Sequence, residues 1–437
     1  MAKSISWKQG LRSLLFWSII SAAFIGPGTV TTASKAGASF QLSLLWALVA
    51  SIGATILLQE AAARLTIASG KSLGEIIALK YQRSGGKSIQ WMVFFAVAFG
   101  CMAYQAGNML GALSGLALIV DWNIRWMTIP LALLCAALLW IGNFRIIANL
   151  LGLVVALMGL AFVYAAFQSD LGMGHLLVAV LVPSFPEGAS LLIVGLVGTT
   201  IVPYNLFLAS GISQGQSVSE MRIGIVLAVI IGGMISIAIL LVGTQVLGEF
   251  SFVALSNILM ERSGNWVAAL FGFGLFAAGL SSSITSPLAA AVTAQSLFGA
   301  NDPSWSAQSA RFRMVWGIIL AIGLLFGWLK VKPIPAIILA QAINGALLPI
   351  IASFLLLAVN DRTLIPEAYR NSSGLNLLML LIVALAGFLG LNNVLKAMAK
   401  VLPAGVLTDT YFLWGASTGA GILCIILGYK IFATRSN

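Results

Sequence analysis

The sequence predicts an all-α integral membrane protein of about twelve spanning helices, on the evidence of its composition and of two interrupted apolar stretches. Hydrophobic residues make up 60% of the 437-residue chain and charged residues only 8%, whereas soluble proteins carry about 25% charged residues. A spanning helix needs about 20 apolar residues, and such stretches follow one another along nearly the whole chain. We therefore expect lipid to be the main solvent of this protein. Little of the chain is left over for a soluble domain.

The apolar stretches place the expected helices in order along the chain. A short basic segment precedes the first stretch, which we interpret as an uncleaved helix because nothing resembles a cleavage site. The expected spans are residues 14–40, 43–66, 89–118, 127–143, 147–167, 188–213, 223–247, 266–297, 312–328, 335–358, 374–394 and 410–432.

The basic residues are divided unevenly between the two sides of the expected membrane. With twelve spans both termini lie on one side, and that side holds sixteen of the 23 Lys and Arg residues. Cytoplasmic loops carry an excess of Lys and Arg, so we expect a multi-pass protein of the plasma (bacterial inner) membrane with both termini in the cytoplasm. The net charge of +11 then indicates topology and contact with anionic lipid, and no nucleic-acid partner is expected.

Two expected spans contain helix breakers at mid-depth. The first span reads Gly26-Pro27-Gly28-Thr29, and the sixth reads Val202-Pro203-Tyr204-Asn205. Proline removes a backbone donor and glycine weakens a helix, and open backbone at membrane depth survives only against protein or a polar cavity. Matched breaks in two halves are typical of inverted-repeat transporters and point to the substrate site.

Other chemistry is poorly represented in the expected spans. The three cysteines, Cys101, Cys135 and Cys424, lie in apolar stretches without paired spacing, and the one histidine, His175, lies in a loop. No nucleophile–base pair, acid–base pair or cofactor motif falls at mid-depth, so we expect neither an enzyme nor a cofactor. Glu60 and Arg64 are one turn apart and are interpreted as an i,i+4 ion pair near the membrane surface.

Four stretches of the chain carry a distinctive pattern. They are residues 26–74, residues 198–211 (GTTIVPYNLFLASG), residues 275–290 (LFAAGLSSSITSPLAA), and residues 340–350 (AQAINGALLPI) followed by Asn360-Asp361-Arg362. Together they resemble the NRAMP (natural resistance-associated macrophage protein) family of divalent metal transporters along most of the chain. The resemblance implies a single LeuT-type transmembrane domain, with inverted five-helix repeats at about 14–167 and 188–358 and extra helices at about 374–432.

The residues that bind metal in the family have changed. The family's helix 1 signature is Asp-Pro-Gly-Asn, and Gly26 and Thr29 replace its two ligands. The helix 6 signature is Met-Pro-His-Asn, and Val202 and Tyr204 replace its Met and His. The family's proton-relay positions are filled by uncharged residues, Gln105, Asn108 and Ala209.

The expected substrate site therefore consists of neutral groups. Its residues are Ala23, Gly26, Pro27, Gly28, Thr29, Thr199, Val202, Pro203, Tyr204, Asn205 and Gln341. Transition metals are usually held by carboxylate, imidazole or sulfur, so no metal ligand is assigned. The start of each second half-helix is mildly electropositive. These features favour a small neutral or anionic solute, moved by alternating access without the family's proton coupling.

Two alternatives to this substrate remain open. The chain could carry a divalent cation, as hydrated Mg²⁺ or Mn²⁺, through carbonyl and amide contacts. It could also be a non-transporting sensor on the same fold. The hydroxyl-rich residues 281–286 leave sodium coupling open, although such hydroxyls commonly bond within their own membrane helix. The sequence leaves the oligomeric state open as well.

Overall fold

A computed structural model describes residues 25–81, 86–121, 123–142, 145–169, 171–213, 215–299, 302–329, 331–399 and 409–436. Within these residues the regular structure consists of α-helices and three short 3₁₀ turns, joined by loops. The predicted all-α fold class is therefore confirmed.

The first half of the described chain contains seven α-helices. They are α2 (Pro27–Phe40), α3 (Leu45–Ser69), α4 (Leu73–Tyr81), α5 (Gly86–Ala117), α6 (Ile124–Ile141), α7 (Arg145–Phe167) and α8 (Met173–Leu181), with the turn η1 (Gln41–Leu44) between α2 and α3. Helix α4 begins after the left-handed Gly70 that ends α3, because glycine adopts this backbone conformation without strain.

The second half contains nine α-helices among the described residues. They are α9 (Ser190–Thr200), α10 (Pro203–Ile212), α11 (Val218–Gly243), α12 (Phe252–Ser263), α13 (Trp266–Phe298), α14 (Ala310–Trp328), α15 (Pro333–Ala358), α16 (Ser373–Ala399) and α17 (Asp409–Ser436), with the turns η2 (Pro303–Trp305) and η3 (Glu367–Tyr369). Helix α11 begins with a capping box, in which Ser217 and Glu220 each satisfy the other's backbone amide.

Ten segments of the described residues are long and apolar enough to cross a membrane. One of them, residues 27–69, contains both α2 and α3, and α6 supplies a shorter apolar helix at Arg125–Ile141. Helices α9 and α10 together form another segment. Each expected span thus overlaps a helix or helix pair of the structure. The beginning of the first span lies outside the described residues.

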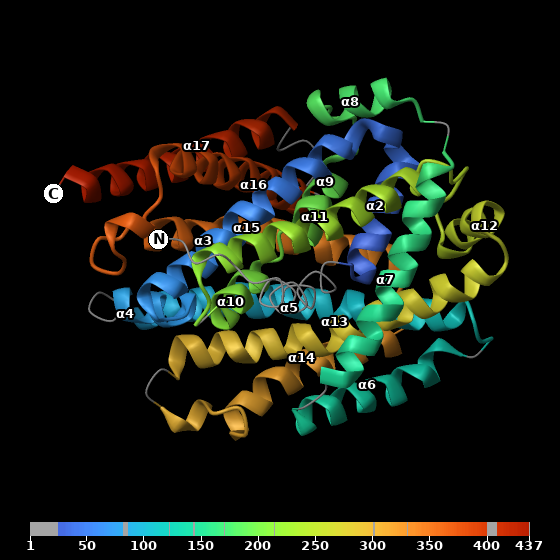
Figure 1. The fold of residues 1–437 in the computed structure, drawn as a ribbon, viewed down its shortest axis with the longest axis horizontal. Coiled ribbons are helices and arrows are strands. Elements are labelled where there is room, and N and C mark those ends of the chain that lie inside the picture. Colours follow the sequence, from blue (N-terminus) through green and yellow to red (C-terminus); the bar gives the residue numbers. More distant parts are fainter. Residues whose placement is uncertain are drawn as a thin grey trace.

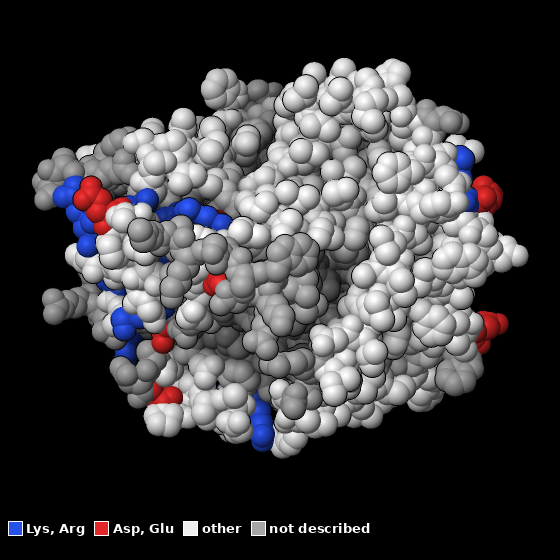
Figure 2. Space-filling view, viewed as in Figure 1, with Lys and Arg blue, Asp and Glu red and all other residues white. Residues whose placement is uncertain are grey.

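Three short helices, α4, α8 and α12, were not among the expected spans. They have 9, 9 and 12 residues, which is too short to cross the hydrocarbon core. On the face in Figure 2, most visible charged side chains lie toward the two ends, with a broad uncharged band between them. A polar surface at each end of an apolar band is what a multi-pass membrane protein requires.

Helices α5, α13 and α15 run through the middle of the molecule, with α16 and α17 along one edge and α6 and α14 along the other (Figure 1). Small residues allow α5 and α13 to approach closely. A Cβ atom added to Gly115 would lie 2.5 Å from the backbone nitrogen of Phe276, and one added to Gly279 would lie 2.6 Å from Ala112. Such close crossings are typical of membrane helices, and they fix the wall of the bundle that faces the two breaks.

Candidate functional site

The sixth span is broken where the sequence predicts. Helix α9 ends at Thr200, and α10 begins at Pro203. Between them, Val202 is extended, with φ −77° and ψ 118°, because a residue before proline is biased away from the helical region. The backbone polar groups of this short segment are therefore available to other parts of the protein.

The first span shows the corresponding start of a half-helix. Helix α2 begins at Pro27, and Gly26 precedes it in extended conformation, with φ −92° and ψ 176°. No side chain caps this helix start, so its first backbone N–H groups point toward the break. The preceding residues, including the predicted site residue Ala23, lie outside the described residues.

The two breaks meet each other and α15. The hydroxyl oxygens of Thr29 and Thr199 are 2.9 Å apart and buried, which joins α2 to α9. A Cβ atom added to Gly28 would lie 2.1 Å from the amide nitrogen of Gln341, and one added to Gly198 would lie 1.9 Å from the carbonyl oxygen of Gln341. The structure thus brings Gly28, Thr29, Thr199 and Gln341 together from three helices, and we call this meeting point the junction.

The remaining predicted site residues are buried around this junction. Pro27 packs against α5, where a Cβ atom added to Gly111 would lie 2.1 Å from its ring. Val202, Tyr204 and Asn205 are 5%, 5% and 2% exposed, and the backbone N–H of Asn205 donates to the carbonyl of Val202 at 3.0 Å. Of the predicted set, the described residues therefore all lie at the ends of the half-helices or on α15.

Two residues outside the predicted substrate site also line the breaks. Tyr104 of α5 donates its hydroxyl hydrogen to the carbonyl of Gly198, and its ring meets the ring of Tyr204 edge to face with centroids 5.7 Å apart. Ser282 of α13 supplies the atom nearest to a Cβ added at Gly26, its hydroxyl oxygen at 3.2 Å. The polar stretch around Ser282 was noted in the sequence, whereas no local signal marks Tyr104.

Several buried polar atoms have no hydrogen-bond partner among the described residues. At the junction these are the side-chain oxygen of Gln341 and the side-chain nitrogen of Asn205. Buried polar groups in proteins are nearly always paired, and leaving a buried donor or acceptor without a hydrogen bond costs about 1–3 kcal/mol. The junction therefore presents both an acceptor and a donor suited to a polar ligand or its bound water.

The predicted relay positions hold uncharged, buried residues. Gln105, Asn108 and Ala209 are 0%, 4% and 0% exposed, and both side-chain polar atoms of Gln105 are unpaired in the described structure. Over the described residues, no group of three or more His, Cys, Asp or Glu side chains is placed to hold a metal ion. Among the described residues, the junction offers a ligand amides, hydroxyls and backbone groups.

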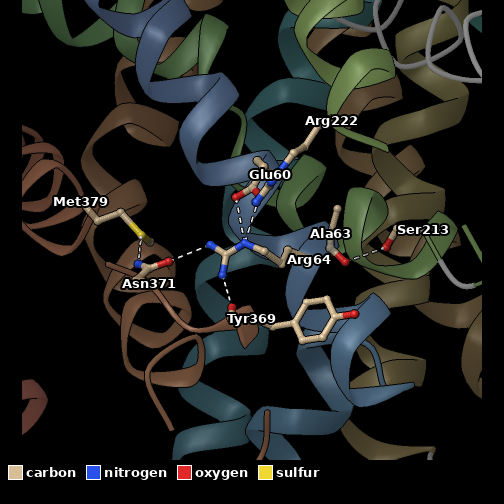
Figure 3. Close-up of polar contacts among 8 residues, drawn as sticks. All are labelled: Glu60, Ala63, Arg64, Ser213, Arg222, Tyr369, Asn371 and Met379. Atoms are coloured by element: carbon tan, nitrogen blue, oxygen red, sulfur yellow. Dashed lines mark hydrogen bonds and ion pairs between the residues drawn. The ribbon is translucent and has the colours of Figure 1, made fainter. Parts of the chain in front are cut away.

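The ion pair predicted between Glu60 and Arg64 forms, and it belongs to a larger polar cluster (Figure 3). The Glu60 carboxylate also accepts a hydrogen bond of 2.9 Å from the guanidinium of Arg222 on α11. The two terminal nitrogens of Arg64 donate to the carbonyl of Tyr369 and to the side-chain oxygen of Asn371, the latter at 2.7 Å. Glu60 thereby ties α3 to α11, and Arg64 ties α3 to the segment between α15 and α16.

A second ion pair lies near the same end of the molecule. Lys80 of α4 and Asp361, just after α15, are 2.6 Å apart. Burial raises the pKa of Asp361, but hydrogen bonds from Lys80 and Thr363 outweigh this and hold the pKa below the ordinary aspartate value. The carboxylate is therefore charged at neutral pH and fastens α4 to the end of α15.

An apolar cavity of about 630 Å³ lies away from the breaks, between α5, α6 and α13. Its walls include Trp126 and Phe276, and Trp126 is 66% exposed. None of the predicted site residues lines it. An open apolar groove on membrane-facing helices is suited to lipid chains rather than to a polar substrate.

Comparison with known proteins points to one family. The model of the family described as natural resistance-associated macrophage protein-like (Nramp) matches residues 18–396. A protein of Verminephrobacter eiseniae described as the divalent metal cation transporter MntH is 26% identical over 375 residues, which cover 81% of this chain and 82% of the relative. The MntH protein of Granulibacter bethesdensis is 26% identical over 79% of this chain and 80% of its own length.

Solved structures share the fold. A mutant of the Eremococcus coleocola manganese transporter superposes with a TM-score of 0.74 at 20% identity, covering 99% of this chain and 97% of that one. Mhp1, a transporter of the nucleobase-cation-symport-1 family, superposes with a TM-score of 0.56 at 16% identity, covering 97% and 93%. These likenesses confirm the predicted LeuT-type, all-α membrane fold.

Proposed function

Because the chain belongs to the Nramp family, we propose that it is a secondary transporter that moves a divalent metal cation across the membrane by alternating access. The observation that carries this proposal is the junction of the two half-helices with Gln341, whose side-chain oxygen is buried and unpaired among the described residues. Interrupted helices place substrate sites near the bilayer midplane in such transporters. Curated relatives that cover about four fifths of the chain are described as divalent metal cation transporters.

The relatives support the cation that the sequence left as an alternative, and they do not support the neutral or anionic solute that it favoured. The sequence-based preference rested on lost ligands, because Gly26 and Val202 stand where the family has Asp and Met. The alternative, a hydrated cation, does not need those ligands, because the cation brings its own water. Mg²⁺ sheds its water reluctantly and is usually bound with several waters in place.

A hydrated cation suits the neutral groups of the junction. The first-shell water of a divalent cation is a strong hydrogen-bond donor, and the side-chain oxygen of Gln341 and the hydroxyls of Thr29 and Thr199 are acceptors. Keeping the water also lowers the cost of burying the charge where no carboxylate offsets it. We therefore propose that the substrate is bound as a largely hydrated ion, in the manner of Mg²⁺ or Mn²⁺.

The coupling and orientation are part of the same proposal. Gln105, Asn108 and Ala209 do not titrate, so proton coupling by the family's relay positions is not expected. The excess of Lys and Arg on the side of the termini supports a cytoplasmic location for both ends. Substrate-dependent acidification of proteoliposomes would contradict the absence of proton coupling.

Titration calorimetry on the purified protein tests the substrate. We expect saturable heat with MgCl₂ and MnCl₂, its loss in Gln341→Leu, and its retention in Gln90→Leu, a control near the start of α5 whose amide bonds only the Ala78 carbonyl. Amino acids and small carboxylates are titrated in the same buffer. Saturable heat from one of these and none from either cation would overturn the proposal.

A further inference from the structure

The carbonyl groups at the end of α9 are satisfied in an uneven way. The last turn of a helix leaves its carbonyls without donors from the same helix. The carbonyl of Val197 accepts from the backbone N–H of Ile201 at 2.8 Å. The donor four residues after Thr199 would be Pro203, which has no N–H. Proline therefore leaves the Thr199 carbonyl open at the break.

The two neighbouring carbonyls are covered by hydroxyl groups from other helices. Thr55 of α3 donates to the carbonyl of Thr200 at 3.3 Å. Tyr104 of α5 donates to the carbonyl of Gly198. The two hydroxyls thus cover the Gly198 and Thr200 carbonyls. Among the described residues, the Thr199 carbonyl in this last turn is left for a substrate.

Tyr104 is placed to control access to the break from the α5 side. Its side chain is 5% exposed, and its ring meets the ring of Tyr204 edge to face at an interplanar angle of 83°. Its hydroxyl thus holds the end of α9 while its ring packs against the start of α10. The hydroxyl bond and the ring contact together place Tyr104 over the Gly198 carbonyl.

We propose that Tyr104 is a specificity-determining residue that favours a hydrated Mg²⁺-like ion by withholding the Gly198 carbonyl from the substrate. This inference rests on the proposed transport of divalent cations. Ca²⁺ takes six to eight oxygen ligands in flexible geometry, whereas Mg²⁺ keeps its waters and needs few protein ligands. A site with fewer open carbonyls therefore selects against Ca²⁺ more strongly than against Mg²⁺.

The test compares the Mg²⁺ and Ca²⁺ dissociation constants of the parent protein, Tyr104→Phe and Tyr164→Phe by calorimetry. Tyr104→Phe keeps the ring and removes only the hydroxyl, and Tyr164 of α7 is an exposed control. We expect Tyr104→Phe to shift the ratio of the two constants toward Ca²⁺ by about tenfold, which corresponds to about 1.4 kcal/mol. Tyr164→Phe leaves the ratio unchanged.

A purely structural role for Tyr104 would lower the melting temperature without moving that ratio. An unchanged ratio in a folded Tyr104→Phe protein, with both cations still bound by the parent, overturns the inference and leaves the proposed function standing. If the parent binds neither cation, the proposed function fails and the inference fails with it. Should Tyr104→Phe not fold, Tyr104→Leu also removes the hydroxyl from the Gly198 carbonyl, and an unchanged ratio there overturns the inference equally.

Discussion

Replacing Arg64 with methionine tests whether the polar cluster of Figure 3 holds the helix ends together. Arg64 is 3% exposed, and it donates to Glu60 at 3.0 and 3.1 Å, to Asn371 at 2.7 Å, and to the carbonyl of Tyr369. Methionine retains most of the volume but makes none of these bonds. The variant therefore leaves a partly buried carboxylate, a buried amide and a carbonyl short of one donor each.

The expected loss follows from what remains around Glu60. Removing one partner of a buried ion pair costs about 3–5 kcal/mol, because the other charge is left buried. Glu60 keeps its bond to Arg222 at 2.9 Å, although that side chain is 55% exposed. We therefore expect the free energy of unfolding to fall by about 3 kcal/mol, the lower end of that range.

Denaturant unfolding of the purified protein in one detergent measures this loss, with Arg311→Met as the matched control. Arg311 pairs with Asp302 at 3.4 Å, and the two side chains are 57% and 47% exposed, so its loss should not change stability measurably. A loss below about 1 kcal/mol for Arg64→Met would refute the reasoning, since a surface pair is worth no more than that.

Three other changes have defined outcomes. Gly198→Ala should unfold the protein or abolish transport, because the new Cβ would lie 1.9 Å from the backbone oxygen of Gln341. In the control Gly211→Ala, the new Cβ meets nothing within 4 Å, so this variant should be tolerated. The melting temperature and the uptake of both variants check this prediction. The lowered pKa of Asp361 means that its stabilisation is complete above the ordinary value of 3.8 and is lost as the pH falls through the lower folded-state value. Melting curves from neutral to acidic pH should show a weaker acid loss in Asp361→Asn, and parallel curves would count against the ion pair. Combining Gly26→Asp, Thr29→Asn and Val202→Met restores the family's ligands and should tighten Mn²⁺ binding more than about tenfold by calorimetry. No gain would mean that these three positions do not determine the affinity for Mn²⁺.

The helices and their breaks were readable from the sequence because their causes are local. Pro27 and Pro203 each end a run of backbone hydrogen bonds wherever they occur, and long apolar runs specify spans without reference to the rest of the chain. The partners of Arg64 could not be read in this way. Its bonds to Tyr369 and Asn371 join residues 305 and 307 positions apart, and no periodicity in the sequence connects them.

The substrate was the less readable part of the site, for a different physical reason. Counting side-chain ligands at Gly26, Thr29, Val202 and Tyr204 shows that charged and soft ligands are gone. It does not show whether the backbone is open or covered, because that depends on hydroxyls from distant helices. Tyr104 and Thr55 cover carbonyls 94 and 145 positions away, and the number of oxygens left open decides how much water an ion must keep.

The walls of the junction differ in how freely they can change. On the α15 side, backbone lies against backbone at Gly198, so a larger residue there would displace whole helices. Gly28 instead faces the side-chain amide of Gln341, which can shift. On the α5 and α13 sides, side chains make the wall, namely the hydroxyl of Tyr104 over Gly198 and the hydroxyl of Ser282 beside Gly26. A substitution at these two side chains would change the polar groups beside the breaks without pressing new atoms against the backbone of α15. Ion preference in this scaffold should therefore be adjustable from α5 and α13, while the α15 wall keeps the breaks in place.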